Sequence, residues 1–275
     1  MRASSTLGDL ARSRELLTNL TLRELRGKYK RSAIGWAWSL LNPLATMAIF
    51  SVVFLFFLKV PTPVGDPSGL QIFALYLLCG LLPWNLVANG MSGGMAAILG
   101  NANLIKKVFF PREVLVGASV ASWVFSLLIE VGVLAVALVV VGNMVLPWLP
   151  LVALVVVAQT CFVLGIALLL SVLNVYFRDT QHLVAILTQF WFYATPIVYP
   201  MSLVSDAAKD HSFPIVGLYE LNPMVRFVEI YRNLLYDLRF PAAVDVAYVV
   251  GVSVLTLLAG YLVFRRLEPK LAEEL

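Results

Sequence analysis

Six apolar stretches separated by short polar segments dominate the pattern of this chain. A hydrocarbon core of about 30 Å requires roughly 20 consecutive apolar residues in a helix. Five stretches reach that length, whereas 183–199 is shorter and contains Thr188, Gln189 and Thr195. The predicted spans lie at about 38–58, 70–99, 114–141, 146–173, 183–199 and 244–264. The pattern therefore predicts an all-α integral membrane protein with six transmembrane helices.

Two further segments show amphipathic helical spacing. One runs from Thr6 to about Lys28 and is followed by basic residues. The other, 223–237, lies within the long segment 200–243 between the fifth and sixth spans. Its apolar face contains Met224, Phe227, Val228, Tyr231, Leu234 and Leu235, and its polar face contains Arg226, Glu229, Asn233 and Asp237. This helix either lies in the membrane interface or is re-entrant and closes the mouth of a channel. The shortness of the fifth span favours the second interpretation.

The distribution of Lys and Arg predicts the orientation. If residues 1–35 are cytoplasmic, the inside segments hold 15 of the 20 Lys and Arg residues and the outside segments hold five. Positive residues are enriched on the cytoplasmic side of membrane proteins. We therefore expect an inner-membrane protein of one domain, 1–275, with both termini in the cytoplasm. Residues 1–35 lack the short apolar run of a secretory signal peptide.

The composition agrees with a membrane location. Hydrophobic residues make up 60% of the chain and charged residues only 13%, which excludes a water-soluble domain of this length. The basic residues flank the spans, so the net charge of +4 does not indicate a nucleic-acid partner. Cys79 and Cys161 lie in apolar runs and are expected to be core residues.

Several kinds of chemistry are absent from the sequence. There is no GxxxxGK[ST] phosphate loop, so we expect no ATP hydrolysis by this chain. The two histidines, His182 and His211, form no metal-binding pattern, no GxSxG motif is present, and no cofactor is expected. Glu130 is the one carboxylate deep in a span, where burial of a charge is costly. It is either a polar contact in a conduit or a structural group helped by Ser126, and we favour the structural interpretation.

Aromatic residues are the main positive feature. One group lies in or just before the first span: Trp36, Trp38, Phe50, Phe54 and Phe57. Another lies in the middle of the short fifth span and includes Phe190, Trp191 and Tyr193. The apolar faces of sugar rings stack on aromatic rings, so these groups fit a conduit for glycans. The alternative for any one ring is ordinary packing or contact with lipid.

The cytoplasmic loop 101–113 is unusual because it contains two adjacent aromatic residues. Phe109 and Phe110 lie between Lys106-Lys107 and Arg112. An apolar knob ringed by charge is typical of a docking element. The alternative is an anchor in the membrane interface with snorkelling lysines.

Five ordered motifs carry a resemblance to a known family. They are LRGKYKRSAIGWAWSLLNP (25–43), IKKVFFPRE (105–113), LNVYFRD (173–179), ATPIVY (194–199) and LNP (221–223). Together they span nearly the whole chain, and in this order they resemble the permeases of polysaccharide ABC exporters of the Wzm and TagG type. That family exports O antigens, teichoic acids and related glycans such as cell-wall galactan.

The resemblance implies a function and a set of partners. It implies a homodimer bound to two copies of a separate ATPase, which holds ATP and Mg²⁺, and an undecaprenyl-linked polysaccharide as substrate. It implies that 1–35 contains a cytoplasmic interface helix, that 36–264 is the bundle with a periplasmic gate segment at 200–243, and that 265–275 is a cytoplasmic tail.

The resemblance also assigns roles to residues. The ATPase-coupling residues are Lys106, Lys107, Phe109, Phe110, Pro111, Arg112, Arg178 and Asp179. The gate residues are Tyr199, Pro223, Phe227 and Tyr231. The channel residues come from the first and fifth spans and are Trp36, Trp38, Phe50, Phe54, Phe57, Phe190, Trp191 and Tyr193.

Three other functions compete with polysaccharide export. A permease of similar architecture that exports a drug or a small lipid would need fewer aromatic residues. A membrane glycosyltransferase or acyltransferase would need paired acids or a histidine-centred site at one membrane face, and neither is present. A scaffold without transport activity would leave the amphipathic segment 223–237 unexplained.

Overall fold

Helices form all of the secondary structure in the part of the chain that the computed structural model describes, residues 7–28, 34–57, 59, 62–108, 110–209 and 215–271. Five of these helices, with bounds Leu40–Phe57, Phe73–Gly100, Glu113–Val140, Leu146–Tyr176 and Ala243–Leu267, are long and apolar enough to cross a membrane. They confirm five of the predicted spans to within a few residues.

The five spanning helices are built from these elements. The first consists of α2 (Trp38–Ser51), which follows the short helix η1 (Gly35–Ala37), and the π-helical turns η2 (Val52–Phe57). The others are α3 (Phe73–Gly100), α5 (Glu113–Val140), α6 (Leu149–Tyr176) with the preceding η3 (Leu146–Trp148), and α11 (Ala243–Leu267), which ends in η5 (Glu268–Lys270).

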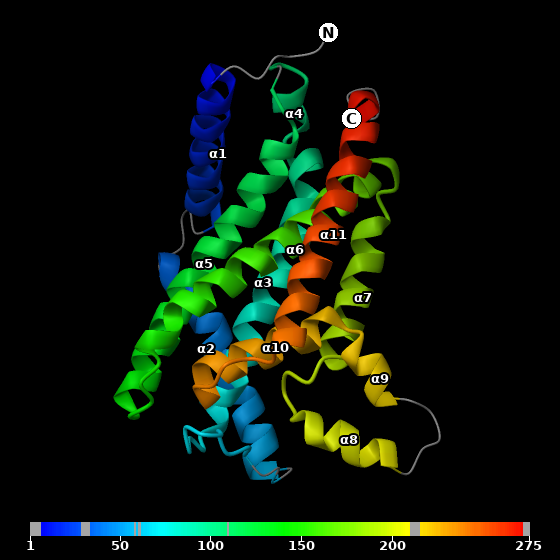
Figure 1. Cartoon of the computed structure of the whole chain (residues 1–275). Helices are drawn as coiled ribbons and strands as arrows, with labels where there is room; N and C mark the ends of the chain where they lie inside the picture. Colours follow the sequence, from blue (N-terminus) through cyan, green and yellow to red (C-terminus); the bar gives the residue numbers. More distant parts are fainter. Residues whose placement is uncertain are drawn as a thin grey trace.

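The predicted span 183–199 differs from the prediction. It is the 14-residue helix α7, Thr180–Tyr193, which at 1.5 Å per residue is about 21 Å long and falls short of the hydrocarbon core. The chain leaves the helix in a series of turns at Ala194–Tyr199, where Pro196 provides no backbone N–H to continue it. In Figure 1, α7 runs from the end that carries the termini to about the middle of the bundle, and it packs against α3 and α6.

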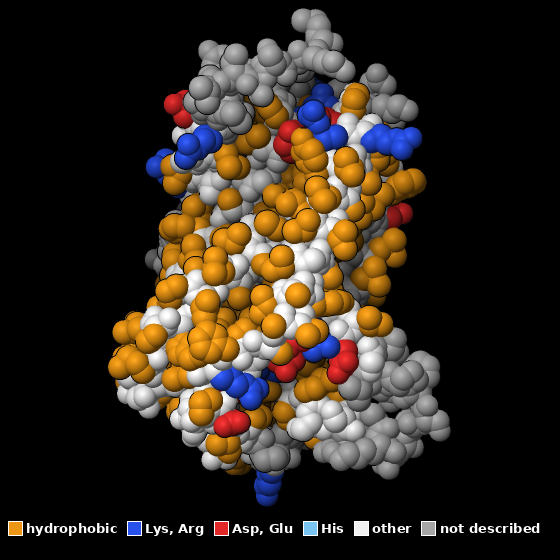
Figure 2. All heavy atoms as spheres, viewed as in Figure 1, with side chains coloured by type: hydrophobic (Ala, Val, Ile, Leu, Met, Phe, Trp, Pro, Cys, Tyr) orange, Lys and Arg blue, Asp and Glu red, His pale blue; other side chains and the backbone are white. Residues whose placement is uncertain are grey.

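The core of the bundle is centred on α3. Most of the apolar window of this helix is buried inside the chain, whereas the corresponding windows of α2 and α11 face outward for most of their length. α6 packs against α3 on one side and α11 on the other, and α5 also packs on α3 (Figure 1). Outward-facing Val, Leu and Ile of the spanning helices form a broad apolar belt. Charged side chains gather at two levels near the ends of the bundle, as Figure 2 shows.

Both termini lie at the same end of the bundle, here called the terminal end (Figure 1). The helix α1 (Leu7–Lys28) stands there against α5, close to the predicted bounds 6–28. The short helix α4 (Ala102–Ile105) and the turn at 177–179 also lie at this end.

The opposite end, here called the far end, is closed by shorter helices. α8 (Met201–Lys209) and α9 (Ile215–Glu220) lie outside the bundle, whereas α10 (Pro223–Arg232) and the π-helical turn η4 (Asn233–Asp237) cross it (Figure 1). α10 packs against α3, α6 and α11. Its predicted apolar face is fully buried, which fits a re-entrant helix and not one that rests on the surface.

Candidate functional site

Aromatic rings from four helices meet around Trp191 of α7. The Trp191 ring lies edge-on to Trp84 of α3, with centroids 5.7 Å apart, and 6.3 Å from Phe162 of α6. Phe162 in turn lies 5.8 Å from Phe227 of α10. These contacts join the short helix α7 to α10 through the core.

A second chain of rings connects α7 to the first span. Phe192 lies 5.5 Å from Trp84 and 6.1 Å from Phe50 of α2. Phe50 contacts Phe54, which stacks on Phe73 at the start of α3 with 5.9 Å between centroids. The two groups of aromatic residues that the sequence singled out are therefore in contact within one chain.

Four of the remaining predicted channel residues are exposed on the surface of the chain. Trp38, Phe57 and Tyr193 are exposed, and Phe190 is 72% exposed. The side chain of Trp36 lies outside the described residues. The assignment of all eight residues to a channel wall stays a prediction. Phe50, Phe54 and Trp191 pack against the core, whereas the other four rings with described side chains are exposed.

Asn222 ties the start of α10 to the end of α7. Its side-chain oxygen accepts hydrogen bonds from the Met224 backbone N–H (3.0 Å) and from the Trp191 indole N–H (2.8 Å). Its amide nitrogen donates to the Ala194 carbonyl and to the Thr195 hydroxyl, both at 3.1 Å. Asn222 is therefore the N-cap of α10, and Pro223 occupies the first helical position, where its missing N–H costs nothing.

Arg232 holds the other end of α10. It is buried, and its two terminal nitrogens donate to the carbonyls of Pro196 and Ile197, each at 2.7 Å. Its guanidinium also lies 3.8 Å from the centroid of the Tyr76 ring. The turn after α7 leaves these carbonyls without helical partners, and Arg232 supplies their hydrogen bonds. Backbone groups inside a membrane protein need such internal partners because water does not reach them.

The four predicted gate residues lie in or beside this far-end assembly. Tyr231 is fully buried and donates to the Gln159 side chain at 2.8 Å, and Gln159 donates to the Pro83 carbonyl inside α3. Phe227 is buried in the aromatic cluster described above. The Tyr199 hydroxyl donates to the Tyr193 carbonyl at 2.6 Å and lies 3.2 Å from the Tyr219 hydroxyl.

The polar face of α10 borders a cavity of about 230 Å³ at the far end. Glu229 and Asp237 line it together with Arg232 and Arg239. Partial burial raises the pKa of the Glu229 carboxyl and of the Asp237 carboxyl. Arg226, on the same face, instead pairs with Asp245 at the start of α11 at 2.6 Å, which fixes α10 to that helix.

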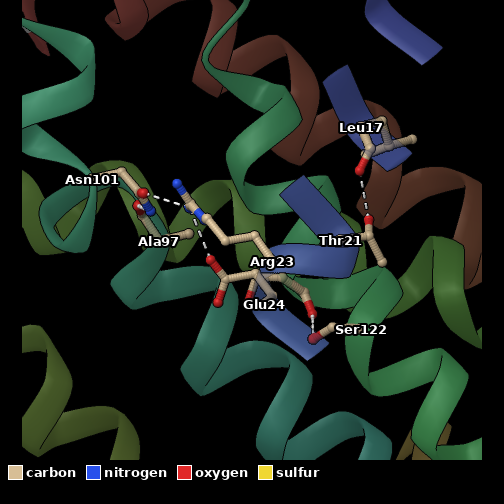
Figure 3. Close-up of polar contacts among 8 residues, drawn as sticks. Leu17, Thr21, Arg23, Glu24, Ala97, Asn101 and Ser122 are labelled. Atoms are coloured by element: carbon tan, nitrogen blue, oxygen red, sulfur yellow. Dashed lines mark hydrogen bonds and ion pairs between the residues drawn. The ribbon is translucent and has the colours of Figure 1, made fainter. Parts of the chain in front are cut away.

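The terminal end carries the predicted coupling residues. Arg23 of α1 donates to the Asn101 side chain at 2.6 Å and pairs with Glu24 at 3.0 Å; Figure 3 shows Arg23 pointing from α1 to the end of α3. Asn101 also donates to the Ala97 carbonyl at 2.8 Å. α1 is therefore linked to Asn101, the first residue of the loop 101–113, which is here called the coupling loop.

Within the coupling loop, Lys106, Lys107 and Pro111 are exposed and Phe110 packs partly against the core. Arg112 donates to the Glu268 carbonyl at 2.5 Å, which connects the loop to the C-terminal end of α11. Arg178 and Asp179 are exposed in the turn before α7, and Phe109 lies outside the described residues. The predicted docking role stays a prediction.

One detail of the expectation for Glu130 differs in the structure, whereas its structural role stays a prediction. Glu130 is not satisfied by Ser126, because the Ser126 hydroxyl donates to the Ser122 carbonyl within its own helix at 3.2 Å. The sequence reasoning also missed Arg232, Asn222 and Gln159. Gln159 had a signal, since a polar residue inside a spanning segment is costly without a partner.

Comparison with known proteins identifies relatives along almost the full length. The family model described as "ABC-2 type transporter" matches residues 15–236. An O-antigen export system permease protein, RfbA, of Myxococcus xanthus is 30% identical over 267 residues, covering 97% of this chain and 98% of the relative. An RfbA protein of Klebsiella pneumoniae is 29% identical, with 94% of each chain covered. The polysialic acid transport protein KpsM of Escherichia coli is 25% identical, covering 90% of this chain and 92% of the relative.

Proposed function

Because this chain belongs to the ABC-2 type transporter family, we propose that it moves an undecaprenyl-linked polysaccharide outward across the inner membrane, driven by a separate ATPase. That the chain is a permease subunit of a polysaccharide exporter follows from its relatives. The observation that carries this conclusion is the nearly full-length similarity to permeases of O-antigen export and of polysialic acid transport. The prenyl linkage of the cargo is part of the proposal.

The arrangement of the far end supports export through the bundle. α7 reaches only about halfway, and the re-entrant helix α10 fills the space beyond it. The two helices are joined by Asn222, Arg232 and the Trp191 ring cluster. A movement of α10 would therefore also move α7. An outer gate over a conduit requires such a link between the gate helix and the conduit wall.

The proposed assembly is a dimer of this chain with two ATPase subunits. Much of the apolar surface of α7 is uncovered in one chain, with Leu183, Ile186, Leu187, Phe190 and Tyr193 all exposed. A second copy that covers this face would line a conduit between two α7 helices. The ATPases are proposed to bind at the terminal end, where the coupling loop, the turn at 177–179 and α1 lie together, so both termini would be cytoplasmic.

The experiment is depletion of this chain in its native cell. Lipid-linked glycan inside and polysaccharide outside are then quantified separately. The proposal predicts accumulation inside and loss outside, both reversed by re-expression. Unchanged glycan distribution, with sensitivity to a small toxic compound instead, would favour the drug or small-lipid exporter and contradict the proposal.

A further inference from the structure

A polar cavity lies in the apolar bundle on a side that the aromatic cluster of α7 does not reach. It has a volume of about 210 Å³ and is lined by residues from the end of α1 and from α2, α3 and α5. A cavity of this size is smaller than a pocket for a drug-sized ligand but has room for about seven water molecules at roughly 30 Å³ each. It therefore suits a single ring-sized polar group.

Two charged side chains face this cavity, the buried Glu130 and the half-buried Lys28; their charges attract each other, but they form no ion pair among the described residues. Glu130 is only 9% exposed, and its carboxylate makes no hydrogen bond or ion pair within the described part of the chain. The Lys28 ammonium lies 3.2 Å from the centroid of the Trp123 ring, and among described residues no acceptor lies within hydrogen-bond distance of it. Leaving such groups without polar partners inside a membrane protein is expensive. A ligand that donates to the carboxylate would remove that cost.

Three amide side chains surround the same space. Asn42 of α2 and Asn85 and Asn89 of α3 line the cavity. Their amide groups form no hydrogen bond with any residue that the structure describes. Each amide offers donors and an acceptor. The cavity is thus lined by hydrogen-bonding groups of both kinds that have no hydrogen-bond partner among the residues the structure describes.

Two indole rings complete the lining. Trp123 is brought close to α3 because residue 93 is glycine: a Cβ there would lie 2.9 Å from the indole nitrogen. Trp38 stands at the exposed rim, with 43% of its surface accessible. The cavity therefore combines two indole rings, one of which carries the Lys28 ammonium on one face, with amides and one carboxylate.

This combination fits a sugar better than an anion. The hydroxyls of a sugar both donate and accept, and its apolar ring face can lie on an indole. An anionic phosphate is disfavoured because the Glu130 side chain faces the same space, and because burial lowers the pKa of the Lys28 ammonium to about 7, which leaves that cation only partly charged near neutral pH. We propose that the cavity binds one sugar residue of the lipid-linked glycan before it enters the conduit, an inference that rests on the proposed function.

The test places a photoreactive benzoylphenylalanine at Trp38 in the intact permease–ATPase complex, in cells that make the glycan. After irradiation the permease is purified under denaturing conditions. Attached glycan is detected by periodate oxidation and hydrazide labelling, which needs no knowledge of the sugar. The same probe at Leu128, on α5 but facing outward, is the matched control, and Asn42 is a second position if the Trp38 protein does not accumulate.

We expect a glycan adduct at Trp38 and none at Leu128. Adding Asn89→Leu, which keeps the size but removes hydrogen bonding, should lower the adduct about fivefold, as expected for one lost hydrogen bond. An adduct with the mass of a phospholipid and no glycan would overturn the proposal.

A probe at Tyr193 separates the two hypotheses. An adduct at Tyr193 with none at Trp38 or Asn42 would refute the sugar site and leave the export function standing. Absence of glycan adducts at every position would count against the proposed function itself.

Discussion

Two polar residues at the far end of the bundle stabilise it by binding backbone carbonyls. Arg232 donates to two carbonyls of the turn after α7, and Asn143 donates to the carbonyls of Leu235 and Tyr236 in η4 at 3.0 and 3.2 Å. These bonds form where the chain leaves regular helix. Because water is scarce there, losing such a side chain leaves carbonyls without partners.

Arg232→Met should therefore destabilise the protein by roughly 1.5–3 kcal/mol, since hydrogen bonds to a charged group are lost in a buried position. Thermal unfolding of the purified protein measures the loss. The stability of Arg232→Lys should lie between that of wild type and that of Arg232→Met. An ammonium cannot bind both carbonyls in the fixed geometry of a guanidinium. The exposed Arg266→Met is the control, and equal losses at both positions would contradict the structural role.

Lys28 makes stability depend on pH. Burial lowers the pKa of its ammonium from the ordinary value of 10.5 to about 7. Between these values the unfolded chain holds a proton that the folded protein has lost, so the contribution of Lys28 to the free energy of unfolding rises with pH. The melting temperature of wild type relative to Lys28→Met should therefore rise from pH 7 to pH 9. A difference that does not change with pH would show that Lys28 is not buried in this way.

At the residue scale, the sequence predicted which kinds of residue matter, but not which residues they contact. The aromatic groups of the first and fifth spans were predicted, and Phe50 does meet Phe192. Their division into packed and outward rings was not predictable, because helical spacing does not show which neighbour covers each face. Arg232 was missed because its partners, Pro196 and Ile197, lie 36 and 35 positions away in the sequence.

At the scale of elements, the closest approach of two long helices depends on glycine. α6 and α11 cross where Gly165 and Gly260 face each other, and a Cβ on either would collide with the backbone of the opposite helix. Small residues permit such contacts between membrane helices. The crossing fixes α11, which also carries Asp245, the partner of Arg226 on α10.

Gly260→Leu should separate α6 from α11 and cost about 1–3 kcal/mol or more, as overpacking a close contact does. Gly251→Leu, on the same helix with open space around its Cα, should cost much less. Yield of folded protein and melting temperature compare the two variants. If both are equally stable, the close crossing is not a determinant of the fold.

The coupling loop allows a prediction about an element at the terminal end. Replacing Phe109 and Phe110 by Asp should abolish co-purification of the ATPase while the permease still accumulates in the membrane, since a docking knob would lose its apolar surface. Met144→Asp, in an exposed turn at the far end, should leave the complex intact. An intact complex in the Phe109/Phe110 variant would indicate a membrane-interface anchor instead.

The positions of the helices were easier to predict from the sequence than the contacts of single residues. Hydropathy alone placed five spans because lipid contact demands long apolar runs. The segment 223–237 is helical, as α10 and η4, whereas its re-entrant character stays a prediction. The length of α7 was overestimated because the apolar run continues beyond Tyr193 through Ile197 and Val198, which are buried in turns and not in helix.

At the scale of the whole molecule, we propose a permease with a conduit that α10 closes at the far end. At the terminal end the permease would be coupled to an ATPase. Tyr193 tests the conduit, because its ring is exposed and its replacement should not disturb the core. Tyr193→Ala should slow export about fivefold with ATP hydrolysis retained, taking the lower end of roughly 1–3 kcal/mol per aromatic stacking contact. Leu258→Ala, similarly exposed but on α11, should have little effect. Wild-type export rates in the Tyr193 variant would remove that ring from the conduit.

The central claim is that this chain carries lipid-linked polysaccharide across a membrane when an ATPase drives it. The most direct measurement uses vesicles that contain the purified permease and ATPase, with lipid-linked glycan in the leaflet that faces ATP. Glycan protected from an added glycosidase is then followed over time. The account predicts protection that requires ATP and both proteins, and no ATP turnover by the permease alone. Protection that arises equally without ATP, or without this chain, would contradict it.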